Sequence, residues 1–206
     1  MQTTNYHKPA AFPGQILLSF LLLLAISPCM AQTSWYKSDC PRFQKQGEVW
    51  YFGEKSGIDF RSGTADALTD QNVMTAFKAS AVISDSLGNL LFFTNGNKVW
   101  DRNFDLMPNA TGLAGDLGAT QPCIIVPWPG NPDSYYIFTV DILKFSDSIT
   151  YSTKGLTCTG IDMRARNGLG DAMLTFLNKP LLSPVCQKIT AVKHKNDKYY
   201  WVITHE

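Results

Sequence analysis

Short apolar runs separated by turn-forming residues fill the chain from residue 49 to residue 204. The runs are rich in β-branched and aromatic residues, and clusters of Gly, Asn, Asp and Pro lie between them, which is the pattern of β-strands joined by turns. This pattern predicts eight strands, at residues 49–53, 80–85, 90–94, 123–128, 135–140, 148–152, 156–163 and 199–204. The predicted fold class is therefore all-β.

Residues 66–78 come closest to a helical pattern. Leu68, Val73, Met74 and Phe77 are spaced so that they would share one side of a short helix, but a loop accommodates the same residues equally well. Both alternatives stay open for this segment, and neither changes the predicted fold class.

One hairpin pattern occurs three times. Thr94, Thr139 and Thr204 each end a predicted strand after two apolar residues, and a turn and another apolar strand precede them, at residues 81–83, 123–126 and 189–192. The threonines are 45 and 65 residues apart. Repeats of this length that contain several strands are typical of a β-propeller, in which small sheets pack face to face.

Both faces of an inner propeller strand are buried, and the uninterrupted apolar runs LLFF and YYWVI fit that requirement. A β-sandwich with one solvated face would more often alternate apolar and polar residues, and it is the alternative fold. Residues 32–206 correspond to three to four blades of roughly 40–50 residues, whereas closed propellers typically have about four to eight. We therefore expect a partial propeller that is a fragment, with its remaining blades in a longer chain.

The first 31 residues have the layout of a secretory signal peptide. An apolar run of 11 residues, 16–26, follows His7 and Lys8 and precedes a stretch of small residues that ends at Ala31. This layout predicts cleavage between Ala31 and Gln32. A membrane-spanning helix needs about 20 apolar residues, so a retained anchor is the weaker interpretation. We expect a secreted protein or one on the outer cell surface, whose only link to the membrane is the cleaved leader.

Cysteines and charge narrow the possible chemistry. Four cysteines remain after the leader, and export makes oxidation the default, so up to two disulfides with three possible pairings are expected among Cys40, Cys123, Cys158 and Cys186. Four buried free thiols are the alternative. Residues 32–206 hold 17 basic and 17 acidic side chains and no basic stripe, which argues against nucleic acid as a partner.

Six segments in order resemble a known family. They are WYFG (50–53) with GIDF (57–60), ISDSLGNLLFFTNG (83–96), VWDRNFDLMPNATGL (99–113), YYIFTVD (135–141), NGLGD (167–171) and KITAVKH with YYWVITHE (188–206). Together they resemble the N-terminal region of large bacterial surface proteins that carry a gliding-motility-associated, type IX secretion (type B) sorting domain. The resemblance implies a propeller-like domain, export and passage to the cell surface. It implies no catalytic residues, and the sorting domain itself is not in this sequence.

The sequence predicts a binding or scaffolding module that is not an enzyme, has no cofactor or metal, and contacts an extracellular protein or polysaccharide. An extracellular glycan hydrolase is the alternative, because paired carboxylates can cleave glycosidic bonds. The carboxylates for it would come from strand ends and turns, where aspartate is also an ordinary turn residue. These candidates are Asp59, Asp85, Asp141, Asp162 and Asp171.

Histidines and aromatic residues supply the remaining candidates. His205 and Glu206 could begin a zinc-protease motif, but the strand pattern before them favours a strand end. His194 and His205 flank the last hairpin, where cross-strand pairing could bring them together as a weak metal signal. The weak candidates for sugar binding are the aromatic residues near strand ends, Trp100, Trp128 and Tyr151.

Overall fold

Antiparallel β-strands make up almost all of the secondary structure. The computed structural model describes residues 45–69, 73–142, 144–146, 149–151, 154–196 and 198–206. These residues form sixteen β-strands and three short 3-10 helices, in several antiparallel sheets and with no closed barrel among them. The all-β prediction is confirmed. The predicted leader with its cleavage site at Ala31 and Gln32, and also Cys40, lie outside the described residues.

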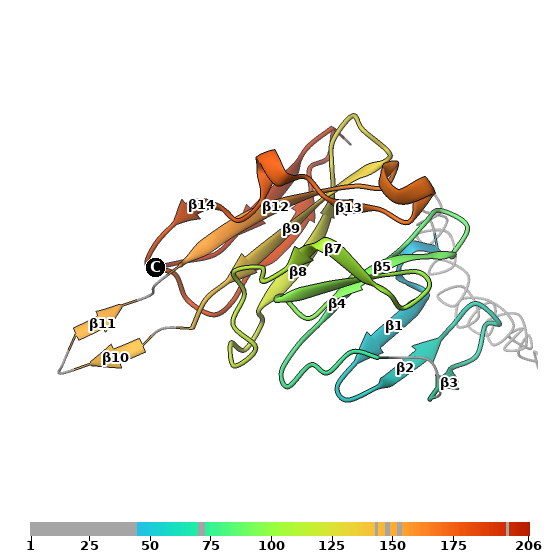
Figure 1. The fold of residues 1–206 in the computed structure, drawn as a ribbon, viewed down its shortest axis with the longest axis horizontal. Helices are drawn as coiled ribbons and strands as arrows, with labels where there is room; N and C mark the ends of the chain where they lie inside the picture. Colours follow the sequence, from blue (N-terminus) through green and yellow to red (C-terminus); the bar gives the residue numbers. More distant parts are fainter. Residues whose placement is uncertain (1–44, 70–72, 143, 147–148, 152–153, 197) are drawn as a thin grey trace, which may run out of the picture. The chain divides into compact units, whose positions relative to one another are not determined.

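Two sheets come from the first half of the chain (Figure 1). The 3-10 helix η1 (Lys45–Gly47) leads into sheet 1, which has the order β1-β2-β3. Its strands are β1 (Val49–Phe52), β2 (Ser56–Asp59) and β3 (Asp66–Leu68). Sheet 2 has the order β4-β5-β6-β7. Its strands are β4 (Ala81–Ser84), β5 (Leu90–Thr94), β6 (Lys98–Asp101) and β7 (Leu106–Thr111).

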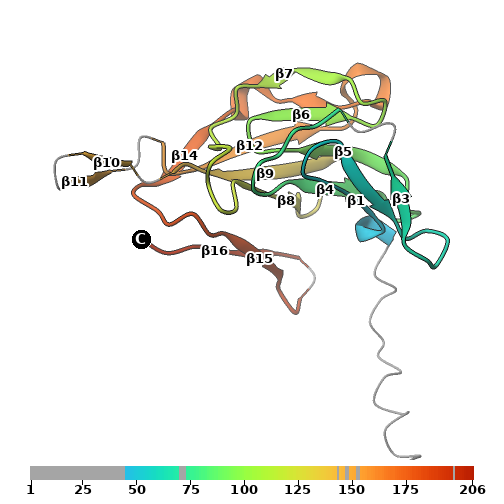
Figure 2. The same ribbon diagram turned by 90° about the horizontal axis from the view of Figure 1, so that it is seen from below.

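Two further sheets come from the second half. Sheet 3 has the order β8-β9-β12-β13, and β14 also pairs with β12. Its strands are β8 (Cys123–Pro127), β9 (Ser134–Val140), β12 (Leu156–Asp162), β13 (Asp171–Ala172) and β14 (Lys179–Leu182). The 3-10 helices η2 (Ala165–Gly168) and η3 (Leu174–Phe176) connect its last strands. Sheet 4 is the hairpin of β15 (Thr190–Lys193) and β16 (Tyr200–Ile203). A separate ribbon of β10 (Lys144–Ser146) and β11 (Ile149–Tyr151) extends away from the other strands (Figures 1 and 2).

All eight strand segments predicted from the sequence contain a strand. The three repeated hairpins are also confirmed, because β4 pairs with β5, β8 with β9, and β15 with β16, each antiparallel. Ala81 lies opposite Thr94 and Cys123 opposite Thr139, so two of the marker threonines occupy the same place in their hairpins. The helix considered for residues 66–78 does not form in its described part, where β3 precedes a single bridge between Thr75 and Glu54.

The apolar side chains form three clusters, one between each pair of consecutive sheets. Sheets 1 and 2 share the first cluster, in which Tyr51 of β1 contacts Phe93 of β5, with ring centres 5.0 Å apart. Sheet 2 supplies Phe92 to the second cluster from its other face. Sheet 3 also contributes side chains to the second cluster. From its opposite face, sheet 3 contributes Val140 to the third cluster, which includes Val202 of sheet 4.

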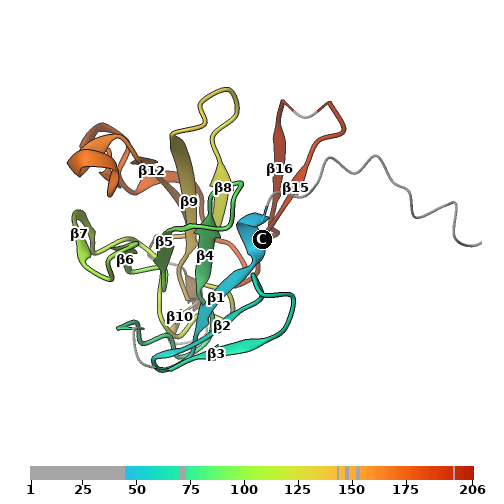
Figure 3. The same ribbon diagram turned by 90° about the vertical axis from the view of Figure 1, so that its right-hand side faces the viewer.

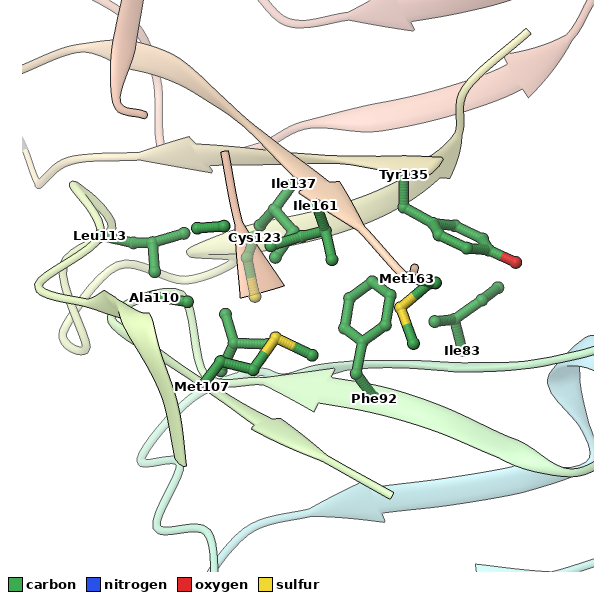
Figure 4. Packing of buried hydrophobic residues seen from close by; sticks show 12 residues of the cluster. Ile83, Phe92, Met107, Ala110, Leu113, Cys123, Tyr135, Ile137, Ile161 and Met163 are labelled. Carbon is green, nitrogen blue, oxygen red and sulfur yellow. The ribbon is translucent and has the colours of Figure 1, made fainter. Parts of the chain in front are cut away.

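The second cluster, between sheets 2 and 3, is the largest of the three (Figure 4). Phe92 and Ile137 are fully buried in it, and Tyr135 packs its ring edge-on against Phe92 at 5.4 Å. Its other labelled members, from both sheets, are Ile83, Met107, Ala110, Leu113, Cys123, Ile161 and Met163. Side chains from both sheets therefore interdigitate in a closely packed interface, which is the arrangement that stabilises face-to-face sheets.

The first strand of each sheet lies beside the first strand of the next. β1 contacts β4, β4 contacts β8, and β8 contacts β15. Figure 3 shows these first strands close together, with the later strands of sheets 1 to 3 farther out. The outer strands β7 and β13 of sheets 2 and 3 also contact each other.

An ion pair links sheets 2 and 3 near these outer strands. Arg166 Nη1 lies 3.0 Å from Asp101 Oδ2, and the Asp101 carboxylate is fully buried. Its other oxygen accepts hydrogen bonds from the backbone N–H groups of Asn103 and Asp105. The guanidinium of Arg102 donates to the carbonyl of Gly168 on the same loop as Arg166. The turn after β6 and the loop after β12 are therefore held together by polar contacts.

Candidate functional site

An open cleft of about 590 Å³ lies at the carboxyl ends of the first strands β4, β8 and β15. Asp85 and Ser86 follow β4, the loop of residues 127–132 follows β8, and Lys193 ends β15. Tyr135, Tyr200 and Gln46 complete the lining. The cleft therefore combines aromatic rings, three prolines, one carboxylate and one ammonium group. Such a mixture of apolar walls and a few polar groups is typical of ligand sites.

Asp85 places a fixed negative charge at this cleft. Burial alone would raise the pKa of its carboxyl group, but hydrogen bonds from the side chain of Asn89 and from the backbone of Asn89, Leu87 and Gly88 outweigh that effect and lower the pKa. The distances from its oxygens to the N–H groups of Leu87 and Asn89 are 2.8 and 2.9 Å. Asp85 is thus ionised at neutral pH, and its oxygens also shape the β4–β5 turn.

Tyr135 joins the cleft to the core. Its ring packs on Phe92, and its hydroxyl points away from the cluster of apolar side chains (Figure 4). Burial raises the pKa of this hydroxyl, and the nearby charges of Asp85 and Asp133 raise it further. The phenol therefore stays protonated at neutral pH and can donate a hydrogen bond to a ligand.

Trp128 is an aromatic lining residue of the cleft whose indole is held in place by its neighbours. Its indole stacks on the ring of Tyr136, with centres 4.2 Å apart and an interplanar angle of 19°. Its backbone N–H donates to the carbonyl of Ser134, and its carbonyl accepts from Asn131, which closes the loop. Gly160 lies underneath, where an added Cβ would come within 3.4 Å of the indole and 3.2 Å of the Phe176 ring. The indole is fixed before any ligand arrives.

The three aromatic residues that the sequence suggested as sugar-binding candidates lie in different parts of the structure. Trp128 lines the cleft, as a binding role requires. Trp100 is only 7% exposed and stacks on Phe93 at 5.6 Å, so it belongs to the core between sheets 1 and 2, and its assignment as a binding residue is wrong. Tyr151 lies on β11, and its side chain is outside the described part of the chain.

The five candidate aspartates do not converge in the cleft. Of them, only Asp85 is a lining residue. Asp59 and Asp162 each bind the guanidinium of the arginine two residues on, which lowers the pKa of both carboxyl groups. Asp171 accepts hydrogen bonds from the backbone and side chain of Asn109. Asp141 accepts from the backbone N–H groups that follow β9 and precede β12. Each carboxylate thus has a structural hydrogen-bond partner of its own.

The histidine pair suggested by the sequence does not form. His194 donates its backbone N–H to Tyr199 at the turn end of the β15–β16 hairpin. His205 lies beyond the other end of β16, where its carbonyl accepts from Cys186. The antiparallel register therefore separates the two rings instead of bringing them together. Within the described residues, no three His, Cys, Asp or Glu side chains are grouped as metal ligands would be.

The three described cysteines, Cys123, Cys158 and Cys186, are free thiols, so the disulfides expected from the sequence do not form among them. Register explains why the two buried ones stay apart. Cys123 lies opposite Thr139 and Cys158 opposite Phe138, so their side chains leave opposite faces of sheet 3. They are also two strand spacings apart, roughly 9–10 Å, whereas a disulfide needs Cα atoms within about 7 Å.

Sequence patterns missed most of the cleft. Tyr135 and Tyr200 were assigned only to strands, and residues 129–134 only to a turn. A usable signal was present, because the repeated hairpins place Tyr135 and Tyr200 at the same position in successive sheets. Equivalent positions of stacked hairpins lie near one another at one end of the sheets, and this would have grouped the two tyrosines.

Compared with known protein families, curated proteins and solved structures, the chain matches none of them. No helix in the described residues is both long enough and apolar enough to cross a membrane.

Proposed function

We propose that this chain is an exported, propeller-like module of the kind that gliding-motility-associated, type IX-secreted surface proteins carry. We also propose that it binds an extracellular polymer or protein at the cleft. The family part of the proposal rests on the six segments described above, and the export part on the leader. The binding part rests on the cleft and on the strands that build it.

One observation carries the proposal: β4, β8 and β15 run in the same direction beside one another. Residues at their carboxyl ends line the 590 Å³ cleft. Residues before their amino ends, such as Ser80, Thr120 and Lys188, line a second hollow of about 510 Å³. In a propeller the blades surround a central channel, and its two mouths are the usual place for a ligand.

The distribution of apolar residues supports the same interpretation. A two-layer sandwich has one core between two sheets. Here three clusters alternate with the four sheets, and adjacent residues of one strand, Phe92 and Phe93, enter different clusters. A row of sheets in which each covers the face of the next is the arrangement of propeller blades.

Binding fits the chemistry of the cleft better than hydrolysis does. A glycan hydrolase needs two carboxyl groups about 5–10 Å apart across an open site. Asp85 is the only one of the five candidate aspartates at the cleft, and its oxygens are occupied by the turn. The prearranged indole of Trp128 instead offers a rigid flat surface, which reduces the entropy that binding costs.

A titration of the protein, residues 32–206, with cellohexaose, xylohexaose and chitohexaose tests the proposal through tryptophan fluorescence. We expect one of these probes to bind and Trp128→Ala to weaken that binding at least about tenfold, as loss of an anchoring aromatic does. The matched control is Trp50→Ala, because Trp50 is exposed and is not a cleft residue.

Equal effects of the two variants would refute the cleft as the binding site. Release of reducing ends from a probe over time would instead support the hydrolase. Failure of all three probes, together with no loss of adhesion to a polysaccharide-coated or protein-coated surface in Trp128→Ala, would refute binding at the cleft altogether.

A further inference from the structure

Asparagine is followed directly by glycine at two places in the chain, Asn95-Gly96 and Asn167-Gly168. Such a pair can modify itself, because glycine has no side chain to shield the backbone nitrogen that attacks the asparagine amide. The reaction requires that this nitrogen is accessible and that the peptide group between the two residues can rotate. The surroundings of the two pairs differ in both respects.

Asn95 is fixed in the turn between β5 and β6. It is only 4% exposed, its side-chain nitrogen donates to the carbonyl of Thr75 at 3.0 Å, and its side-chain oxygen accepts from two backbone N–H groups of the same turn. The N–H of Gly96, whose nitrogen would have to attack, donates to the hydroxyl of Thr94 at 3.0 Å. A Cβ added to Gly96 would lie only 3.0 Å from Pro122. Reaction at this pair therefore requires that the turn first opens.

Asn167 lies at the surface, in η2 between β12 and β13. Its side chain is exposed, and no described residue forms a hydrogen bond with its amide. A Cβ added to Gly168 would have one atom within 4 Å apart from its chain neighbours, Nη2 of Arg102 at 3.6 Å. Arg166 and Asn167 have φ values of 52° and 56°, so the backbone here is not helical, and it belongs to no strand. Rotation of this peptide group therefore breaks no strand pairing.

A cation without an acidic partner lies beside the second pair. Arg102 of sheet 2 donates from its guanidinium to the carbonyl of Gly168. Arg164 and Arg166 each pair with an aspartate, whereas Arg102 forms no ion pair within the described part of the chain. The attacking group is the Gly168 nitrogen after it has lost its proton, and a nearby cation stabilises that negative charge.

We propose that Asn167 is a site of spontaneous deamidation, and that the change weakens the polar contacts between its loop and sheet 2. The deprotonated nitrogen of Gly168 bonds to Cγ of Asn167. The bond from Cγ to the side-chain nitrogen breaks, and ammonia leaves with a proton taken up from water. Water then opens the five-membered succinimide ring at either carbonyl, which yields aspartate or isoaspartate. No atom is oxidised or reduced, and water is the only co-reactant.

The consequence follows from the neighbours of Asn167. Isoaspartate lengthens the main chain by one methylene group at this point. On one side lies Arg166, whose Nη1 is 3.0 Å from the buried carboxylate of Asp101. On the other side lies Gly168, whose carbonyl accepts from Arg102. A longer backbone cannot keep both contacts in place, so part of the stability that the buried ion pair depends on is lost.

The test is incubation of the protein, residues 32–206, in mildly alkaline buffer, followed by mass spectrometry of its proteolytic peptides. We expect Asn167 to convert at least about tenfold faster than Asn95 in the folded protein, because Asn95 reacts only in molecules whose turn has opened. In concentrated urea the two sites should convert at similar rates, because both pairs are then in an open chain. Equal rates in the folded protein, or conversion at neither site there, would overturn the proposal.

A second measurement tests the structural consequence. Urea unfolding of the incubated protein should have a lower midpoint than unfolding of fresh protein. The variant Asn167→Gln is the matched control, because glutamine would have to close a less favourable six-membered ring, and its midpoint should not change on incubation. An unchanged midpoint in protein that has converted at Asn167 would overturn the link to the contacts with sheet 2.

Discussion

Strands β9 and β16 have nearly the same pattern of residues but very different surroundings. Ile137 of β9 is fully buried between sheets 2 and 3, with strands on both sides. Trp201 of β16 is mostly exposed, and among the residues that the structure describes its strand pairs only with β15. The comparison teaches that the apolar pattern specifies a strand and its two faces, whereas the number of neighbouring sheets decides how much that strand contributes to stability.

Thiol labelling should reveal the largest difference between the two regions. Cys123 and Cys158 are buried in sheet 3, whereas Cys186, beside the base of the last hairpin, is partly exposed. Burial raises the pKa of both buried thiols to about 12. Burial acts on Cys186 in the same direction, but its hydrogen bonds with His205, Thr204 and Lys188 lower its pKa overall. We expect Cys186 to react with a disulfide reagent at least ~10³-fold faster, because the buried thiols react only after unfolding.

The same two thiols set a pH dependence. Their folded-state pKa values of about 12 lie above the ordinary value of 9.0. The stability that they contribute is therefore complete below pH 9 and is lost as the pH rises from 9 toward 12, because only the unfolded chain releases these protons there. Urea titrations across that range should show a shallower loss in the variant Cys123→Ala/Cys158→Ala. An unchanged slope would contradict the burial of these thiols.

A matched pair of truncations should give the next largest difference. Ile137→Ala removes a fully buried side chain and should lower the free energy of unfolding by about 3–4 kcal/mol. Val202→Ala changes the equivalent, half-buried residue of β16 and should cost about 1 kcal/mol or less. Chemical denaturation measures both. Similar losses in the two variants would mean that sheet 4 is as firmly attached as sheet 3.

The ion pair between sheets 2 and 3 offers a fourth test. Arg166→Ala leaves the buried Asp101 carboxylate unpaired and should cost about 3 kcal/mol, at the low end for such charges because Arg166 is partly exposed. Arg164→Ala removes a partner of the more exposed Asp162, where solvent screens the ion pair, and should lower the free energy of unfolding much less. The measurement is again the free energy of unfolding, and a reversed order would exclude a structural role for the Asp101 pair.

The smallest expected effect is at the exposed face of sheet 4. Trp201→Ser should change the free energy of unfolding by no more than about 0.5 kcal/mol, because most of the indole is already in water. Tyr136→Ser, at the equivalent place in β9, should cost clearly more because Trp128 stacks on that ring. A large loss from Trp201→Ser would show that its face is covered in solution.

Strand positions could be predicted from the sequence wherever a strand is apolar on both faces. The run 90–94 was found because Phe92 and Phe93 serve different clusters and both must be apolar. The sequence missed strands that are short or contain residues such as Pro108 and Asn109, and these strands form by pairing with a neighbour: β2, β3, β6, β7, β10, β13 and β14. Their strand structure depends on tertiary contacts that local composition does not encode.

The site was harder to predict for the same reason. Trp100 and Trp128 look alike as aromatic residues at strand ends, yet one stacks on Phe93 inside a core and the other lines the cleft. Asp59, Asp85 and Asp162 accept hydrogen bonds from residues two positions on, as turn aspartates do, whereas Asp171 accepts from Asn109, which is distant in sequence. Hydrogen bonds within a turn could be predicted from the sequence. The proximity of the distant loops that line the cleft could not be predicted in this way.

The consecutive residues Phe92 and Phe93 impose a strict rule on strand length. Since they enter clusters on opposite sides of sheet 2, inserting or deleting one residue early in β5 would exchange their directions and spoil two interfaces at once. We therefore expect β5 to have kept its length during evolution. Insertions should be confined to the surface turns of the chain.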